Sequence, residues 1–198
     1  MLASASADLY WLPLGAGAPS GSRLVRVNGR IYEALCASVE RRDRLDLYHA
    51  GLQVQLGDGR FVVEVAPSPD QWSAQRGVVA EGPVGSRLIG GLRLFRYEVR
   101  CWYGGRIPDI DQAVASPVRL TDDPFTAHRL LELTSSVPTP VWGRDELRTG
   151  DMWNSNSVVA WLIANAGLTA EEVPLPPHGR APGWTAGITV ATRQCRAA

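Results

Sequence analysis

The sequence predicts an α+β domain in which antiparallel strands pack against a few helices. Two segments, "YHAGLQVQL" (48–56) and "RFVVEVA" (60–66), alternate apolar and polar residues on either side of a Gly-Asp-Gly turn, which is typical of a β-hairpin. Two later segments, 122–136 and 155–166, carry apolar residues at helical spacing. Because strands and helices fall in separate parts of the chain, an α+β fold is expected.

The chain length predicts one domain over residues 1–198. This length supports one well-packed core and is short for two. A hydrophobic fraction of 45% and a charged fraction of 20% are ordinary for a globular protein. We expect the functional motifs to fall within 45–168, with a C-terminal loop and strand over 169–198.

The N-terminal part is predicted to contain one strand and one helix. A short apolar piece and a Gly/Ala/Pro/Ser connector occupy residues 1–22, and "RLVRV" (23–27) alternates like a strand. Asn28 is a suitable N-cap for the next segment, in which apolar residues that include Leu35 and Val39 recur at helical spacing.

The hairpin predicts which strand residues share a face. In the first strand, His49 and Gln53 lie on the polar side, because strand side chains alternate. If Asp58 and Gly59 form a two-residue turn, Glu64 lies opposite Gln53. His49 is then four residues away along the strand, so direct contact with Glu64 requires a bulge or another register.

The rest of the chain is predicted to hold one more strand, two helices and a final strand. Residues 67–91 are rich in Gly and Pro and form a long loop, which is functional or contains a further element. "LRLFRYEVRCWY" (92–103) alternates as a long strand, and Glu98 lies within it. After the two helices, 174–184 is expected to be loop and "AGITVAT" (186–192) a strand.

Charge and cysteine content exclude several classes of function. Twenty basic and twenty acidic residues give a formal net charge of +0, which argues against nucleic acid as a partner. No apolar run is long enough to span a membrane, and the N-terminus lacks the pattern of a signal peptide. The three cysteines lie far apart, without metal-ligand spacing. We therefore expect a cytoplasmic protein without a cofactor or a metal.

The segment Asn154–Ser157, here called the polar tetrad, begins the last predicted helix. Unpaired backbone N–H groups and the helix dipole favour negative charge at such a position, so an anion formed on Ser155 would be stabilised. Helix capping also accounts for Asn154 and Ser155 without catalysis. A nucleophile at Ser155 needs a base, for which His49 is the candidate, and Glu64 or Glu98 would orient the imidazole.

The order of these motifs resembles the circularly permuted papain-like superfamily. "YHAGL" precedes an acidic strand residue, and "WNSNSVVAWL" opens a late helix. In that superfamily, which includes NlpC-type peptidases and lecithin retinol acyltransferase-like enzymes, a histidine comes first, a polar orienting residue second, and an Asn-Cys pair at a helix start last. "FRYEV" (95–99) followed by the tetrad is also similar to a bacterial branch of uncharacterised members. The resemblance covers roughly residues 45–168.

The resemblance implies a hydrolase or acyltransferase that acts on an amide or ester bond of a small-molecule, peptide or acyl substrate. Ser155 takes the place of the nucleophile and His49 that of the base, and Glu64 or Glu98 takes the third place. In addition, the resemblance puts three residues beside the substrate, namely Trp153, Asn154 and Asn156.

The sequence departs from the family at the nucleophile, because Ser155 stands where the family has cysteine. A helix dipole easily converts a thiol with a pKa near 8.5 to thiolate. The pKa of an alcohol is far too high for the helix dipole to deprotonate it. Attack by Ser155 therefore depends on His49 to take the hydroxyl proton. Three readings therefore stay open: native serine chemistry, an engineered replacement, or an inactive papain-like binding module that has lost its thiol.

Overall fold

The chain folds into one antiparallel sheet with helices, as predicted for an α+β protein. The computed structural model describes residues 5–14, 33–57, 59–67, 77–88, 90 and 95–197. Its strands are β1 (Ala5–Pro13), β2 (Asp46–Leu56), β3 (Gly59–Pro67), β4 (Val78–Pro83), β5 (Arg96–Tyr103), β6 (Val114–Thr121) and the two-residue β7 (Gly179–Arg180).

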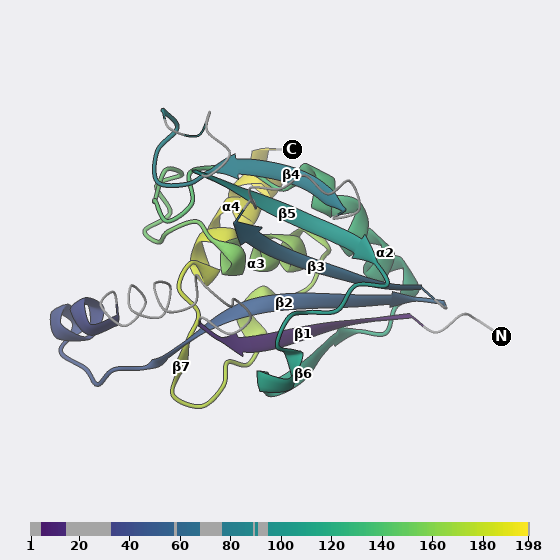
Figure 1. The fold of residues 1–198 in the computed structure, drawn as a ribbon, viewed down its shortest axis with the longest axis horizontal. Coiled ribbons are helices and arrows are strands. Elements are labelled where there is room, and N and C mark those ends of the chain that lie inside the picture. The colour runs from purple at the N-terminus through teal and green to yellow at the C-terminus, as the bar shows by residue number, and fades with distance from the viewer. Residues whose placement is uncertain are drawn as a thin grey trace.

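The strands follow the order β4-β5-β3-β2-β1-β6, from the top to the bottom of Figure 1. Each neighbouring pair in this order is antiparallel. β7 lies off this path and pairs in parallel with the first residues of β2, at Asp46 and Leu47. β2 is therefore central, and its N-terminal end is also where the late segment of the chain returns to the sheet.

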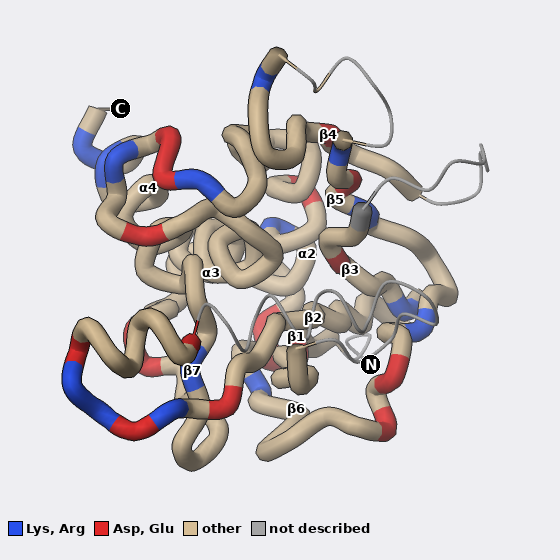
Figure 2. Tube along the Cα trace, turned by 60° about the vertical axis from the view of Figure 1, so that its left-hand side comes forward, with Lys and Arg blue, Asp and Glu red and all other residues tan. Residues whose placement is uncertain are grey.

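The helices lie mainly on one face of the sheet, here called the helix face. The described helices are residues 33–40, α2 (Pro124–Glu132), α3 (Ser155–Asn165) and α4 (Trp184–Ala197), with short 3-10 turns η2 (Ile110–Gln112), η3 (Leu133–Ser136) and η4 (Ala170–Glu172). Figure 2 shows α3 and α4 to one side of the strands, and basic and acidic residues interspersed along the chain.

The main core lies between the helix face and α3. Nearly every residue of α3 is buried, because the helix is covered by the sheet on one side and by α4 on another. Strand and helix side chains meet there in one cluster, which includes Leu52, Val54, Val63, Val99, Val158 and Leu162. This burial fixes α3, and therefore the polar tetrad at its start, against the centre of the sheet.

The opposite face of the sheet, here called the second face, carries a smaller apolar cluster. Leu12, Val62 and Ile107 are buried there, with Trp102 packed against them. Ile107 comes from the segment after β5, which folds back over this face. Because side chains alternate along each strand, the residues between those of the main core point to this side.

Four strands were not predicted, and one of them is the two-residue β7, which lies in the predicted loop 174–184. β1 reads as a short apolar piece because both of its faces are buried, so Leu9, Trp11 and Leu12 show no alternation. β4 is the element concealed in the predicted loop 67–91. β6 has polar and turn-forming residues and two register irregularities against β1, which remove the period-2 signal.

The predicted final strand, 186–192, is wrong, because this segment forms the middle of α4. Its β-branched residues favour a strand, but Ala186, Val190 and Ala191 are buried at helical spacing against α3. Gly187 permits the close approach, since an added Cβ would lie 2.1 Å from the Ser157 carbonyl oxygen. Tertiary packing therefore overrides the local preference.

The predicted hairpin is confirmed, with a corrected register. Leu56 pairs with Gly59, so Gly59 belongs to β3 and not to the turn as predicted. Gln53 consequently lies opposite Val62 and not opposite Glu64. The shift brings Glu64 two residues closer to His49 along the strands than the sequence predicted.

The remaining N-terminal predictions are tested only in part. The predicted strand 23–27 and the N-cap Asn28 lie outside the described residues. Residues 33–40 are helical as expected, but Leu35 is 63% exposed and Val39 is 83% exposed, so this apolar spacing does not mark a buried face. Within the described parts of the chain, none of the helices has the length and apolar character needed to cross a membrane.

We predict that Gly187→Ala destabilises the protein by about 1–3 kcal/mol, because its methyl group would overlap the Ser157 carbonyl oxygen. Helix propensity alone predicts the opposite sign, a gain of about 1 kcal/mol. Urea unfolding measures the difference. Thr192→Ala, at an exposed position of the same helix, is the control and should change stability by less than about 0.5 kcal/mol. A stabilised Gly187→Ala would contradict the described contact.

Candidate functional site

The polar tetrad forms a complete N-terminal cap for α3. The Asn154 side chain accepts hydrogen bonds from the backbone N–H groups of Asn156 and Ser157, and the Ser157 hydroxyl accepts from the Asn154 N–H, which is a capping box. The helix ends at Asn165 with Ala166 as its C-cap, and Gly167 follows with a φ of 87°. The capping prediction for Asn154 is therefore confirmed.

The tetrad is also bonded to the segment that leads into α4. The amide nitrogens of Asn154 and Asn156 both donate to the Pro182 carbonyl, at 2.8 and 2.9 Å. The Ser157 hydroxyl donates to the Gly183 carbonyl at 2.7 Å. A side chain at Gly183 would collide with Asn154 Oδ1, at 2.5 Å. Glycine is therefore required for this approach.

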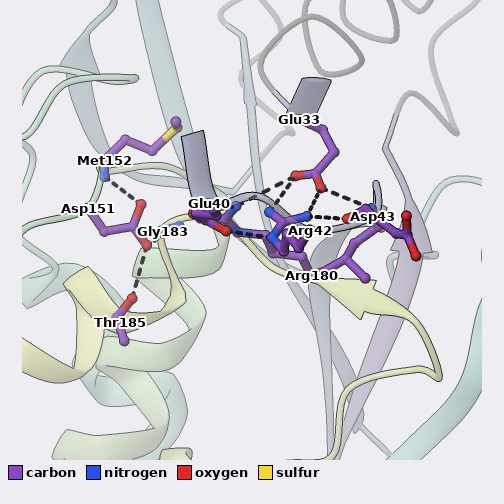
Figure 3. Close-up of polar contacts among 10 residues, drawn as sticks. Glu33, Glu40, Arg42, Asp43, Asp151, Met152, Arg180, Gly183 and Thr185 are labelled. Carbon is purple, nitrogen blue, oxygen red and sulfur yellow. Dashed lines mark hydrogen bonds and ion pairs between the residues drawn. The ribbon is translucent and has the colours of Figure 1, made fainter. Parts of the chain in front are cut away.

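Figure 3 shows that the same segment is tied at both of its ends. Asp151 accepts hydrogen bonds from the Gly183 N–H and the Thr185 hydroxyl, at 2.7 and 3.0 Å. At the other end, the Arg180 guanidinium lies 3.6 Å from Glu33 and 3.4 Å from Glu40, in the helix 33–40. Residues 180–183 therefore connect that helix to the start of α3.

Asn156 bonds the start of α3 to strand β2. Its Oδ1 accepts from the Ala50 N–H at 2.8 Å, and its Nδ2 donates to the Tyr48 carbonyl at 2.9 Å. Asn156 is only 2% exposed. These two backbone groups lie directly before and after His49, so the structure brings the helix start and the His49 segment together.

Ser155 differs from the other three tetrad residues, because its hydroxyl makes no hydrogen bond within the described part of the chain. It is the first residue of α3 and is 6% exposed. Val158 and Val159, three and four residues further along, face the sheet, and helical spacing puts Ser155 on the same side. A hydroxyl without a hydrogen-bond partner among the described residues therefore stands at the start of α3.

His49 lies on the second face of the sheet. It pairs with Leu12, which is buried in the apolar cluster of that face, and directly paired residues share a face. Its Nε2 atom is buried and has no hydrogen-bond partner. Burial lowers the pKa of His49 from its ordinary value of 6.5 to about 4, because the charged form loses hydration. The imidazole is therefore neutral at pH 7.

Glu64 and Glu98 lie on the same face as His49 and share one arginine. Arg100 is opposite Glu64 in the register, and its guanidinium lies 2.9 Å from Glu98 and 3.3 Å from Glu64. Glu98 is fully buried. Burial raises the pKa of Glu64, although Arg100 opposes the shift. Both carboxylates are thus held in a buried ionic cluster with Arg100.

The structure brings some of the predicted catalytic residues together and not others. His49, Glu64 and Glu98 share the second face, whereas α3, with Ser155, packs on the helix face. No hydrogen bond joins His49 to Ser155 or to either acid among the described residues. What connects the two faces is Asn156, whose amide occupies the edge of β2 beside His49.

The three residues predicted to contact a substrate make contacts within the protein. Trp153 is 2% exposed and belongs to the main core, so its ring surface does not form the wall of a cleft. The amides of Asn154 and Asn156 are used in hydrogen bonds within the protein. All three residues therefore help to build the site, and their contact with a substrate stays a prediction.

Two contributors to this region were missed in the sequence. Arg100 is two residues after Glu98, and the alternation of "RYEVR" could have shown that both side chains share a face. Pro182 acts through its backbone carbonyl, for which the sequence has no signal. Among the described residues, no group of His, Cys, Asp and Glu side chains is arranged to hold a metal ion.

Comparison with models of known families, with curated proteins and with solved structures gave no match. The papain-like resemblance therefore stays a prediction from the motifs and their order.

We predict that His49 makes stability depend on pH between 6.5 and 4. The unfolded chain binds a proton on this residue near pH 6.5 and the folded chain only near pH 4, so unfolding becomes easier as pH falls through this range. About 3 kcal/mol is lost between pH 7 and pH 4. This part of the loss should be absent in His49→Gln, as measured by urea unfolding at each pH.

The control for this experiment is His128→Gln. His128 is exposed and lies 3.4 Å from Glu132 on the surface of α2, so its replacement should leave the pH dependence of stability nearly unchanged. If His49→Gln and the wild type lose stability in parallel down to pH 4, His49 is not held neutral by burial.

Proposed function

We propose that the protein is a papain-like hydrolase or acyltransferase that acts on an amide or ester bond. Ser155 is the nucleophile and His49 the general base. The Ser155 hydroxyl would attack the acyl carbon while the imidazole takes its proton, and the backbone N–H of Ser155, which does not donate to the Asn154 cap, would help to stabilise the oxyanion. The imidazole then gives that proton to the leaving amine or alcohol. Water or a second acceptor finally attacks the acyl-serine and releases the acyl group.

The observation that carries this proposal is that the Ser155 hydroxyl and His49 Nε2, two groups without a hydrogen-bond partner among the described residues, belong to the two segments that Asn156 joins. Ser155 is the tetrad residue whose side chain is not used in capping or in binding to a neighbouring segment. His49 has a buried, neutral imidazole, and an acceptor nitrogen on such a ring is what a general base requires. Asn156 connects the residue after Ser155 to the residues around His49.

We predict that a fluorophosphonate probe labels Ser155, as identified by mass spectrometry of the labelled peptide. Ser155→Ala should abolish the label, and His49→Ala should slow labelling about 100-fold or more, the usual loss when a general base is removed. His128→Ala serves as the matched control and should label at the wild-type rate. A folded wild-type protein that never labels, or labels at another serine, would rule out the proposed nucleophile.

One observation favours a second candidate, an inactive papain-like binding module. Both acids proposed to orient His49 are paired with Arg100, and neither bonds the imidazole in the described structure. In such a module the fold of the site would persist while the nucleophile is lost.

Ser155→Cys separates the two candidates. We predict that the introduced thiol reacts with iodoacetamide well below pH 8, because the start of α3 stabilises a thiolate. Cys195, which is exposed on α4, provides an internal reference for an ordinary thiol. Thiol reactivity together with an unlabelled wild type would indicate the inactive module. An introduced thiol that reacts no faster than Cys195 would argue against any activated position at Ser155.

A further inference from the structure

On the edge that faces β3, β2 has no neighbouring strand around His49. Pairing between β2 and β3 ends at Leu52 and Val63, beyond which β3 continues beside β5 alone. On its other edge β2 stays paired, because Leu14 N–H donates to the Leu47 carbonyl and the register with β1 is continuous. The edge of β2 from residue 48 to residue 50 therefore faces a gap in the sheet.

The backbone groups that face this gap belong to Tyr48 and Ala50. Odd-numbered residues at this end of β2 bond to β1, so the N–H and C=O groups of the even-numbered residues point the other way. Buried backbone groups of this kind must be paired, since an orphan costs about 1–3 kcal/mol in desolvation. A neighbouring strand would normally pair them.

Asn156 supplies what the missing strand would have supplied. Its primary amide is planar and carries an acceptor and a donor, like a peptide group, and it pairs the Ala50 N–H and the Tyr48 carbonyl at once. The second amide hydrogen goes to the Pro182 carbonyl. All three bonds are inside the protein, so the position of this amide is fully determined.

We infer that Asn156 is the positioning residue of the site, because it fixes the helix end that carries Ser155 against the strand that carries His49. Ser155 directly precedes it in the chain, and His49 lies between the two residues that it binds. This inference rests on the proposed function. Asn156 does not touch the reacting atoms; it sets the separation between two groups that must meet within hydrogen-bond distance for proton transfer.

Asn156→Asp tests the inference with the smallest change in shape. The carboxylate can still accept from the Ala50 N–H, but it cannot donate to Tyr48 or Pro182 and would face both carbonyl oxygens. We expect the rate constant of fluorophosphonate labelling at saturating probe to fall about 100-fold, the scale of a 1 Å misplacement, while half-saturation by the probe stays nearly unchanged. A loss of probe affinity at an unchanged rate constant would overturn the inference.

Asn165→Asp is the matched control. Asn165 is the last residue of the same helix, and its amide bonds only the Trp161 carbonyl, away from β2. It should label at the wild-type rate. A wild-type rate in folded Asn156→Asp would show that the amide is not needed for positioning.

A second measurement tests the positioning role when Asn156→Asp folds poorly or when the wild type does not label. In Asn156→Ala, the imidazole of His49, followed by NMR titration, should move toward its ordinary pKa by about one pH unit or more, because the edge of β2 is released and hydrated. This readout does not depend on catalysis. An unlabelled wild type would contradict the proposed function alone. An unchanged pKa of His49 in folded Asn156→Ala would contradict the positioning role.

Discussion

The pairing of Asn156 with the open edge of β2 is the interaction on which the candidate site depends. A sheet normally pairs each inner strand along both edges, and here the central strand β2 lacks a neighbouring strand on one edge from residue 48 to residue 50. The Asn156 amide bonds the backbone groups of Tyr48 and Ala50 on this edge. It thereby holds the start of α3 at the place where β2 and β3 separate. Because the amide is buried and its three hydrogen bonds are all made within the protein, the geometry around His49 and Ser155 depends on a single residue.

The local parts of this arrangement could be predicted from sequence. The hairpin, the strand around Glu98, the helix that begins at Ser155 and the cap at Asn154 all follow from alternation, helical spacing and residue preference within a short window. What could not be predicted depends on distant partners. Asn156 bonds residues 106 and 108 positions away, and no pattern near it distinguishes a strand-binding amide from another capping residue. The same holds for Gly187, whose contact with Ser157 turns a strand-like segment into α4.

The ionic cluster on the second face makes Glu64 and Glu98, the two candidates to orient His49, dependent on each other. Glu64 and Glu98 appear interchangeable in the sequence, as two carboxylates that could each orient a histidine. In the fold they are members of one unit, bridged by Arg100 and removed from water. A buried ion pair costs desolvation that its attraction only partly offsets, so replacing any one member would change the charge balance of the whole cluster. Loss of activity in a variant of either acid would therefore not by itself identify the orienting group.

The bonds from Pro182 and Gly183 to the polar tetrad also constrain when the site can form during synthesis. A ribosome makes the chain from its N-terminus, so β2 and α3 emerge before the residues that complete their junction. Until residues 182 and 183 leave the exit tunnel, Asn154, Asn156 and Ser157 lack three of their hydrogen bonds. The nascent chain would thus remain without a finished centre until Pro182 and Gly183 have left the ribosome, and premature termination just before Pro182 would yield a product that has every proposed reacting group but lacks the bonds from this segment.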